Sequence, residues 1–378
     1  MRIALVVPGG VDASGEYRVI PALLALIGRL SRTHDVQVFA LAQGARPGEW
    51  QLAGARIHNI GARSTRRRAV RRILAAHRES PFDLVHSIWS GSSGLVGVVA
   101  AKLLRIPSLV HVAGGELASL PEIGYGGRLT WRGRLRERLT LRAASAVSAA
   151  SAPLIQAIAT LGVGAQRVPL GVDLSVWPAR EPQRRNPADQ ARLIHVGSLN
   201  RVKDQPTLLR ALSALARSGV DFQVDVVGED TLAGEIQNLA RKLGLAEKVT
   251  FRGFLPQRLL RPLVEAAHLL IVSSRHEAGP LVVLEAAAVG VPSVGTSVGH
   301  LAEWAPHGAL AVPVGEAAAL ADAIGSLLAD EELRLAIARE AQRRAILEDA
   351  DHTVRRLETI YASLMSRSGR HHGKPQRR

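Results

Sequence analysis

The chain of 378 residues has no cysteine, only 3% aromatic residues and no long uninterrupted apolar run. The absence of cysteine excludes disulfides, thiolate metal ligands and cysteine nucleophiles, and it fits a reducing compartment. A membrane-spanning helix needs roughly 18 uninterrupted apolar residues, and the nearest candidate, 95–112, contains Lys102, Arg105 and Pro107. The apolar run at the N-terminus is too short for a signal peptide. We therefore expect a cytoplasmic protein with an aliphatic core.

Acidic residues are also few, with 33 Asp and Glu against 48 Lys and Arg, and the resulting charge of +15 is unevenly distributed. Residues 1–180 hold 23 basic and 10 acidic side chains, residues 181–366 hold 20 and 23, and residues 367–378 hold 5 and none. Two arginine-rich runs, 63–78 and 128–142, carry most of the excess in the first half. These runs fit either an anionic membrane surface, a lipid-linked or phosphorylated acceptor, or a solvated surface without a partner. Nucleic acid is disfavoured because Trp131 is the one aromatic residue available for base stacking in these runs.

Short β-branched runs alternate with longer helical patterns along the whole chain, which is typical of parallel α/β architecture. We therefore predict two Rossmann-like, doubly wound domains, with ligands bound in a crevice at the carboxyl ends of the strands. The predicted strands of the first half are 3–8, 36–41, 84–87, 108–112 and 146–149, and those of the second half are 192–196, 223–227, 249–252, 269–272 and 292–295.

The same pattern predicts the domain boundaries. The first domain is expected over 1–175 and the second over 192–350, joined by a linker, 176–191, that is rich in Pro, Arg, Asn and Gln. A C-terminal helix over 351–366 is expected to pack back toward the first domain. The basic tail, 367–378, is expected to be disordered.

The most informative stretch is 273–292, where an apolar strand leads through a polar loop into a helix that begins near Pro280 and ends at Gly290. Such a loop presents free backbone N–H groups at a helix N-terminus, which suits a phosphate group. Glu277 lies just before the helix and Glu285 lies within it, among apolar residues. Because an unpaired buried carboxylate is costly, Glu285 needs a partner, either an internal Arg or Lys or the hydroxyl groups of a ligand.

Two glutamates with seven residues between them, in this strand–loop–helix context, resemble the hallmark of glycosyltransferase family 4. This family comprises retaining nucleotide-sugar glycosyltransferases with the GT-B fold, in which two Rossmann-like domains face each other across a cleft. The resemblance implies that Glu285 binds the ribose hydroxyls of the donor and that Glu277 faces the donor sugar as a catalytic residue. It also implies that the backbone of 278–281 contacts the sugar and the diphosphate, through Ala278, Gly279, Pro280 and Leu281.

A second motif, 195–204, follows the first strand of the second domain. In the family this loop reads Gly-Arg with a lysine five residues after the arginine, and the two cations neutralise the donor diphosphate. Gly197 and Lys203 match the pattern, whereas Ser198 occupies the position of the arginine. Arg201 could supply the missing charge from the other side of the loop, or it could face solvent. The resemblance further implies that the nucleobase contacts backbone near Gly253, Phe254 and Leu255.

The first domain is expected to provide the acceptor side. A glycine-rich loop after its first strand contains Gly9, Gly10 and Gly15, and it would let backbone approach a phosphate or acceptor closely, although any tight turn has a similar sequence. A second loop after the strand 108–112 contains Gly114, Gly115 and Glu116, and Glu116 is a candidate contact for acceptor or sugar hydroxyls. His111, on that strand, is expected in or near the core.

These observations together predict a retaining glycosyltransferase (EC 2.4) that moves a sugar from a nucleotide-diphosphate sugar to an acceptor hydroxyl, without a metal or other cofactor. Three alternatives stay open: a nucleotide-sugar 2-epimerase, a phosphorylase with the same fold, and a non-catalytic protein that binds nucleotide sugars. The sequence leaves the donor sugar, the nucleobase and the acceptor undefined.

Overall fold

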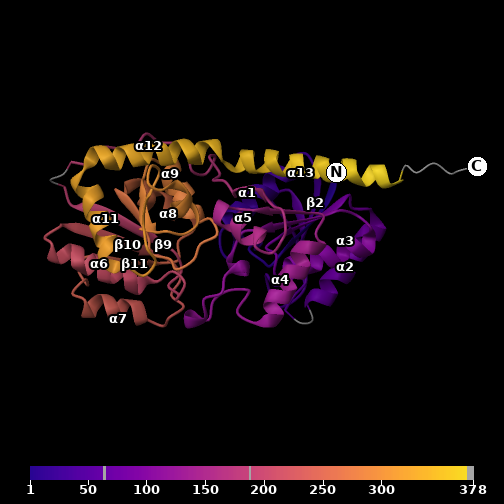
Figure 1. The fold of residues 1–378 in the computed structure, drawn as a ribbon, viewed down its shortest axis with the longest axis horizontal. Helices are drawn as coiled ribbons and strands as arrows, with labels where there is room; N and C mark the ends of the chain where they lie inside the picture. Colours follow the sequence, from indigo (N-terminus) through magenta and orange to yellow (C-terminus); the bar gives the residue numbers. More distant parts are fainter. Residues whose placement is uncertain (63–64, 187–188, 373–378) are drawn as a thin grey trace, which may run out of the picture. The chain divides into compact units, whose positions relative to one another are not determined.

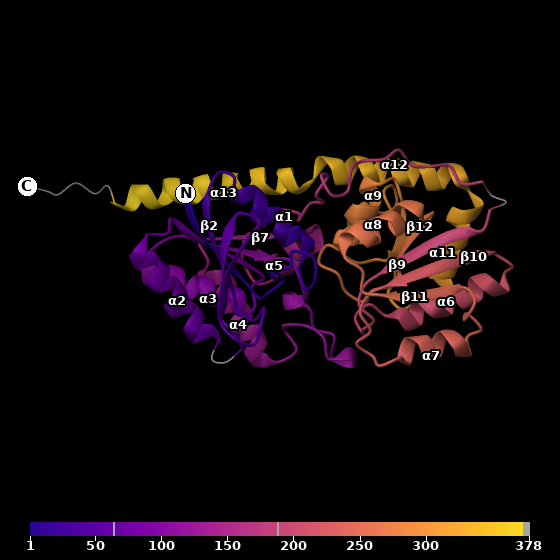
Figure 2. The same ribbon diagram turned by 180° about the vertical axis from the view of Figure 1, so that it is seen from behind.

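The computed structural model describes residues 1–62, 65–186 and 189–372, and it divides the chain into two α/β units (Figure 1; Figure 2). Unit 1 consists of Met1–Leu170 and the chain from Ala350 onward, and unit 2 consists of Gly171–Asp349. Each unit has its own sheet and its own hydrophobic core. In the described part of the chain, no helix combines the length and the apolar composition needed to cross a bilayer.

The sheet of unit 1 has the strand order β3-β4-β2-β1-β5-β6-β7-β8, and its pairs are parallel except for the hairpin β3–β4. The five strands predicted in this half are present with ends shifted by at most one or two residues. The hairpin β3–β4 and the short β8 are additional, because their short, partly polar segments lack the apolar runs that mark buried strands. The strands are β1 Arg2–Val7, β2 Asp35–Ala40, β3 Gly48–Leu52, β4 Ala55–Asn59, β5 Leu84–Ile88, β6 Ser108–Val112, β7 Ala146–Ala149 and β8 Gln166–Arg167.

Helices cover both faces of this sheet, as the alternation of side chains along β1 requires. Ile3, Leu5 and Val7 pack with α1 (Pro21–Leu30) and α13 (Ala350–His372) on one face. Ala4 and Val6 pack with α2 (Thr65–Glu79) and α3 (Ser92–Leu104) on the other. The remaining helical segments of unit 1 are η1 Gly115–Leu117, η2 Pro121–Ile123, α4 Trp131–Ala143 and α5 Ala152–Ala159.

The sheet of unit 2 is entirely parallel, with the order β11-β10-β9-β12-β13-β14. Leu193 and Ile194, neighbours in β9, belong to the two hydrophobic clusters on opposite faces of the sheet. The strands are β9 Ala191–Val196, β10 Phe222–Val227, β11 Val249–Gly253, β12 Leu269–Val272, β13 Ser293–Thr296 and β14 Leu310–Val312. The helices are α6 Gln205–Arg217, α7 Glu235–Lys242, α8 Gln257–Ala266, α9 Leu281–Ala288, α10 Gly299–Trp304, α11 Ala317–Ala329 and α12 Glu331–Leu347.

The C-terminal part differs from the expectation in two ways. Glu348 and Asp349 separate α12, which belongs to unit 2, from α13, which belongs to unit 1 and begins at Ala350 rather than at 351. Helix α13 extends to His372, so 367–372 are helical rather than disordered, and residues 373–378 of the predicted tail lie outside the described residues. Within unit 1, α13 packs on α1, and Thr353 Oγ1 donates a hydrogen bond to the carbonyl of Pro169 at 2.7 Å.

The segment predicted as a linker, 176–191, is bound to unit 2 over its described residues. The indole ring of Trp177 is fully buried in the second cluster of that unit. Arg185 is buried as well, and its Nη2 atom donates to the carbonyl of Leu328 at 2.6 Å. The structure therefore places the change of unit at 170/171 and again at 349/350, because the chain after Leu170 is held by packing on unit 2.

Truncation of Trp177 tests whether this segment stabilises unit 2. We expect Trp177→Ala to lower the free energy of unfolding by about 3–5 kcal/mol, since it removes a fully buried aromatic side chain. Trp131→Ala is the matched control, because Trp131 is 63% exposed, and it should change the value by less than about 0.5 kcal/mol. Urea denaturation of both variants provides the comparison, and equal effects would contradict the assignment.

Candidate active site

The strand order of unit 2 reverses between β9 and β12, and the loops that follow these two strands leave the sheet in different directions. From β9 the chain adds β10 and β11 on one side, and from β12 it adds β13 and β14 on the other. A crevice forms at such a reversal, at the carboxyl ends of the strands, and it is the usual ligand site of open parallel sheets. Both motifs singled out from the sequence, 197–204 and 273–281, lie at this position.

The loop after β9 is fixed by hydrogen bonds that position Lys203. The backbone N–H of Lys203 donates to Asn200 Oδ1 at 3.1 Å, and its carbonyl accepts from Ser273 Oγ at 2.7 Å. Its aliphatic stem lies over Gly197, where an added Cβ would come within 3.1 Å of it. Asp204 then caps α6 in a left-handed conformation with φ of 50°, accepting from Thr207 Oγ1 at 2.9 Å. The lysine side chain is thus directed by its own loop and by the loop after β12.

Lys203 and Glu277 form an ion pair across the reversal. Lys203 Nζ lies 2.6 Å from Glu277 Oε1, and the hydroxyl of Ser274 donates to the same oxygen at 2.6 Å. The two side chains are 24% and 14% exposed, so solvent reaches both of them. The structure therefore brings together two of the predicted residues in a neutral, accessible pair that a charged ligand can compete with.

His195, in β9, connects this strand to β12 and to the start of α6. Its Nδ1 atom lies 3.0 Å from the carbonyl of Ile271 in β12, and Gln205 Nε2 lies 3.2 Å from its Nε2 atom. Burial lowers the pKa of His195 to about 4, so the imidazole is neutral near pH 7 and donates through Nδ1. This residue supports the geometry of the site from inside the core.

The loop that enters α9 packs closely against α10. Pro280 is the N-cap residue of α9 rather than its first helical residue, and the helix ends at Ala288, before Gly290 with φ of 78°. A Cβ on Gly279 would lie 2.9 Å from Nε2 of His300, which stacks on Trp304. His300 did not stand out in the sequence, and its position directly after Gly299, at the start of a helix, is the signal that could have indicated it.

Glu285 is buried in α9, as its apolar surroundings predict, but its partner is neither Arg nor Lys. Gln257 Nε2 donates to Glu285 Oε1 at 2.9 Å, and the carboxyl group is 5% exposed. Burial raises the pKa of Glu285 to about 7. Gln257 is the first residue of α8, so this bond holds α9 beside the segment that contains the predicted nucleobase contacts, Gly253, Phe254 and Leu255.

Two residues in the same loop as Lys203, Arg201 and Ser198, have surroundings that differ from those of the lysine. Arg201 is exposed, and the described residues include no hydrogen-bond or ion-pair partner for its guanidinium group. Ser198 is half-buried, and its carbonyl accepts from Gln205 Nε2 at 3.1 Å. An arginine that the sequence did not single out, Arg275, lies in the loop after β12 with Nη1 3.3 Å from Asp204 Oδ2. The loop after β12 thus contributes a second cation beside Lys203, and this cation is paired with Asp204.

In unit 1 the strand order reverses between β1 and β5, and the first glycine loop follows β1. The backbone of Gly10 has φ of 81°, and an added Cβ would lie 2.6 Å from the side chain of Ile20. Gln43 Oε1 accepts from the N–H of Val11 at 2.8 Å and closes the loop. Gly9 also approaches Gln43, whereas Gly15, with φ of 68°, has an open environment. The loop backbone at Gly9 and Gly10 therefore packs closely against other residues of unit 1.

Glu116 belongs to a buried polar network at the ends of β5 and β6. Its Oε1 atom accepts from the N–H of Ser90 at 3.0 Å, and Ser90 Oγ donates to Glu137 Oε2 at 2.6 Å. Burial, with a smaller contribution from the Glu137 carboxylate, raises the pKa of Glu116 to about 7. Gly114 and Gly115 leave no room for a side chain beside Trp89 and Tyr125. The protein therefore binds one oxygen of Glu116, whereas its Oε2 atom is buried without a hydrogen-bond partner among the described residues.

Two further observations concern the strand ends of unit 1. His111 is buried, as expected, and its Nδ1 atom lies 2.9 Å from Ser148 Oγ. A hollow of about 580 Å³ opens beside the first residues of α2, and the residues that line it are Pro8, Leu41, Ala42, Thr65, Arg66, Arg67 and Ser92. Pro8 and Leu41 directly follow β1 and β2, and Ser92 begins α3, the helix after β5. Arginines therefore line a hollow at the strand ends on the predicted acceptor side.

Comparison with known proteins agrees with this architecture. Residues 19–171 match the model of the glycosyl transferase 4-like domain, and residues 178–344 match that of the glycosyl transferases group 1. The D-inositol 3-phosphate glycosyltransferase of Thermomonospora curvata is 32% identical over 329 residues, covering 77% of this chain and 74% of that protein.

Solved structures show the same fold. Sucrose-phosphate synthase of Thermosynechococcus elongatus superimposes with a TM-score of 0.79 at 20% identity, covering 97% of this chain and 100% of that one. The Anabaena HepE protein in complex with UDP-glucose gives 0.74 at 20% identity, covering 96% and 100%. Two α/β units with these sheets give the chain the GT-B fold of these structures. The chain belongs to the family 4 type of these enzymes, with the 4-like domain followed by the group 1 domain.

The raised pKa of Glu285 has a measurable consequence for stability. The folded protein keeps a proton on this carboxyl between its ordinary pKa near 4.5 and about 7, whereas the unfolded chain releases it, so folding stability falls as pH rises through this window. We expect Glu285→Gln, which cannot ionise, to gain stability relative to the parent protein by about 3 kcal/mol between pH 4 and pH 8.

Urea denaturation across this pH range, without ligand, measures the difference. Glu247→Gln serves as the control, because Glu247 is exposed, and its difference from the parent protein should stay flat with pH. A flat difference for Glu285→Gln as well would contradict the burial of an ionisable group at this position.

Proposed function

We propose that the protein binds a nucleotide-diphosphate sugar at the strand-end site of unit 2 and transfers the sugar to an acceptor hydroxyl with retention of configuration and without a metal. The observation that carries the proposal is the ion pair of Lys203 and Glu277 at the reversal of the strand order. The UDP-glucose complex of the structurally similar Anabaena protein supports a nucleotide-sugar donor.

In this proposal the donor diphosphate displaces Glu277 from Lys203. The ammonium group of Lys203 and the N–H groups at the start of α9 then stabilise the charge that develops on the departing phosphate. Glu277, released from the lysine and still hydrogen-bonded by Ser274, accepts hydrogen bonds from hydroxyl groups of the donor sugar. Glu285 accepts from the ribose hydroxyls, with Gln257 holding its other side. Retention follows from departure and attack on the same face, with the leaving phosphate taking the proton of the acceptor.

We assign acceptor recognition to unit 1 and a phosphate group to the acceptor. Arg66 and Arg67 line the hollow beside the strand ends, and guanidinium groups bind phosphate in a paired geometry. The similar Thermomonospora protein is named for a phosphorylated acceptor, D-inositol 3-phosphate, which supports this class. Loss of the phosphate should therefore weaken acceptor binding more than it slows the chemical step.

Lysine 203 provides the sharpest mutational test. We expect Lys203→Ala to lower kcat/KM for the donor by about 10²–10³, because the charge on the leaving diphosphate loses its nearest cation. Lys242→Ala is the control, since Lys242 is exposed on α7 and should leave the rate unchanged. A thermal-shift screen across uridine-, guanosine- and adenosine-diphosphate sugars identifies the donor first, because a ligand of the folded state raises the unfolding midpoint. A Lys203→Ala variant with parental kcat/KM would contradict the proposal.

The product distinguishes the proposed reaction from its alternatives. The assay uses the identified donor with either D-inositol 3-phosphate or unphosphorylated inositol as acceptor. We expect transfer to the phosphorylated acceptor, an unchanged anomeric configuration by NMR, and the same rate in EDTA. Release of nucleotide without acceptor would favour an epimerase, and dependence on pyridoxal phosphate and inorganic phosphate would favour a phosphorylase. Donor binding without turnover on a wider acceptor panel would favour a non-catalytic binding protein.

A further inference from the structure

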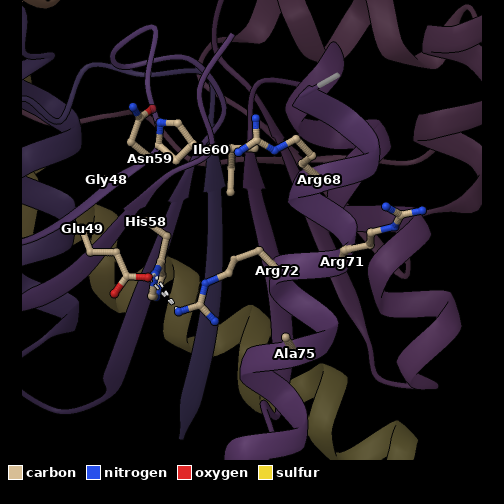
Figure 3. Close-up of a pocket in the computed structure, with 10 residues that line it drawn as sticks. Gly48, Glu49, His58, Asn59, Ile60, Arg68, Arg71, Arg72 and Ala75 are labelled. Atoms are coloured by element: carbon tan, nitrogen blue, oxygen red, sulfur yellow. Dashed lines mark hydrogen bonds and ion pairs between the residues drawn. The ribbon is translucent and has the colours of Figure 1, made fainter. Parts of the chain in front are cut away.

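A second basic hollow lies in unit 1, at the edge of the sheet between α2 and the hairpin β3–β4 (Figure 3). Its volume is about 560 Å³, within the range of small-molecule sites. It differs from the hollow at the strand ends, because α2 contributes Arg66 and Arg67 there and later arginines here. The residues that line it are Pro47, Gly48, Glu49, His58, Asn59, Ile60, Arg68, Arg71, Arg72 and Ala75.

One of its arginines is held in place by a network that joins a buried histidine to an exposed glutamate. Arg72 Nη2 lies 2.8 Å from Glu49 Oε1, and His58 Nδ1 lies 2.9 Å from the same oxygen. The imidazole ring of His58 is stacked on Phe39, with 4.9 Å between centroids, and its Nε2 atom lies 3.0 Å from Gln37 Oε1. These contacts fix Glu49, and Glu49 in turn fixes the guanidinium group of Arg72. An arginine that is already oriented loses less side-chain entropy when it binds a ligand.

Basic side chains outnumber acidic ones in the lining of this hollow. Three arginines are opposed by one carboxylate, and hydrogen bonds from Arg72 and His58 lower the pKa of Glu49, which keeps it ionised. Burial lowers the pKa of His58, so this side chain adds no charge near pH 7. The side chains that line the hollow therefore carry more positive than negative charge, which favours an anionic ligand.

The arrangement of the lining side chains indicates which kind of anion the hollow can bind. Figure 3 shows Arg68 and Arg72 extending from α2 toward β4, whereas the side chain of Arg71 points away from them. Ile60, Pro47 and Ala75 supply apolar wall. A hollow of this volume is too large for a bare ion, and its apolar wall suits the carbon atoms of an organic phosphate. Paired guanidinium groups bind phosphate oxygens with defined geometry.

We propose that the hollow between α2 and β4 binds a phosphate monoester, with Arg68 and Arg72 as its principal ligands and Arg71 at its rim. The phosphate belongs either to a small soluble ester or to the headgroup of an anionic lipid. This site is separate from the donor and acceptor sites proposed above, and it does not depend on them.

The test compares matched charge variants of the full chain. Arg68→Gln/Arg72→Gln removes the proposed ligands, Arg66→Gln/Arg67→Gln alters the strand-end hollow, and Arg32→Gln/Arg78→Gln removes two exposed arginines of unit 1 that line neither hollow. Binding of sn-glycerol 3-phosphate is measured by calorimetry at constant ionic strength. In a parallel arm, the proteins are sedimented with phosphatidylcholine vesicles that contain or lack phosphatidic acid.

We expect at least a tenfold loss of binding in Arg68→Gln/Arg72→Gln alone, in the glycerol phosphate arm for a soluble ester or in the phosphatidic acid arm for a lipid headgroup. An equal loss in Arg32→Gln/Arg78→Gln would show non-specific charge attraction and overturn the proposal. A loss confined to Arg66→Gln/Arg67→Gln would place the phosphate at the strand ends and overturn it too, as would the absence of binding in both arms.

Unfolding midpoints of all variants verify that they fold. If Arg68→Gln/Arg72→Gln does not fold, Arg68→Lys/Arg72→Lys replaces it, since lysine keeps the charge but loses the paired geometry, and binding should still weaken. Transfer activity is assayed separately, so a failure of the proposed glycosyl transfer and a failure of this site give different results.

Discussion

The ion pair of Lys203 and Glu277 depends on one constraint, the reversal of the strand order between β9 and β12. Two loops that lie about 70 residues apart along the chain meet there, because the carboxyl ends of parallel neighbours share one edge of the sheet. Contacts around the ion pair hold the two loops in place. His195 in β9 is bonded to the carbonyl of Ile271 in β12, and Ser273 Oγ donates to the carbonyl of Lys203. In the unliganded protein each charge neutralises the other. In the proposed reaction, a donor with both phosphate and hydroxyl groups replaces this pair with two sets of contacts, so that neither charge is left unpaired.

Buried carboxyl groups recur at both strand-end regions, and they make the folded state sensitive to pH. Glu285 in unit 2 and Glu116 in unit 1 have hydrogen-bond partners that are neutral, an amide side chain and a backbone N–H. A neutral partner offsets the cost of burying a carboxylate less than a cation would. Burial therefore raises the pKa of both glutamates. A protein that only needed stability would have apolar residues at these positions. Retaining these carboxyl groups is consistent with a role in binding hydroxyl groups.

Helix α2 contributes side chains to the core of unit 1 and to two hollows on its surface. Ala69, Ile73 and Ala76 pack into the core of unit 1, and the rest of the helix carries the first arginine-rich run. The sequence left open whether this run meets an anion or only solvent. The structure places five of its arginines at two hollows of similar volume, one at the strand ends and one at the edge of the sheet. Clustered like charges along a helix are unfavourable without counter-ions, and hollows concentrate the resulting field.

The sequence by itself determined the α/β class, nearly all the buried parallel strands, and the positions of Lys203, Glu277 and Glu285, because apolar runs and fixed spacings are local properties of the chain. It did not determine the hairpin β3–β4 or the assignment of α13 to unit 1. Nor could it show that Gln257 is the partner of Glu285, that Arg275 joins Asp204, or that Glu49 orients Arg72. These contacts join residues 23 to 71 positions apart, and their geometry exists only after the strands have chosen their neighbours in the sheet.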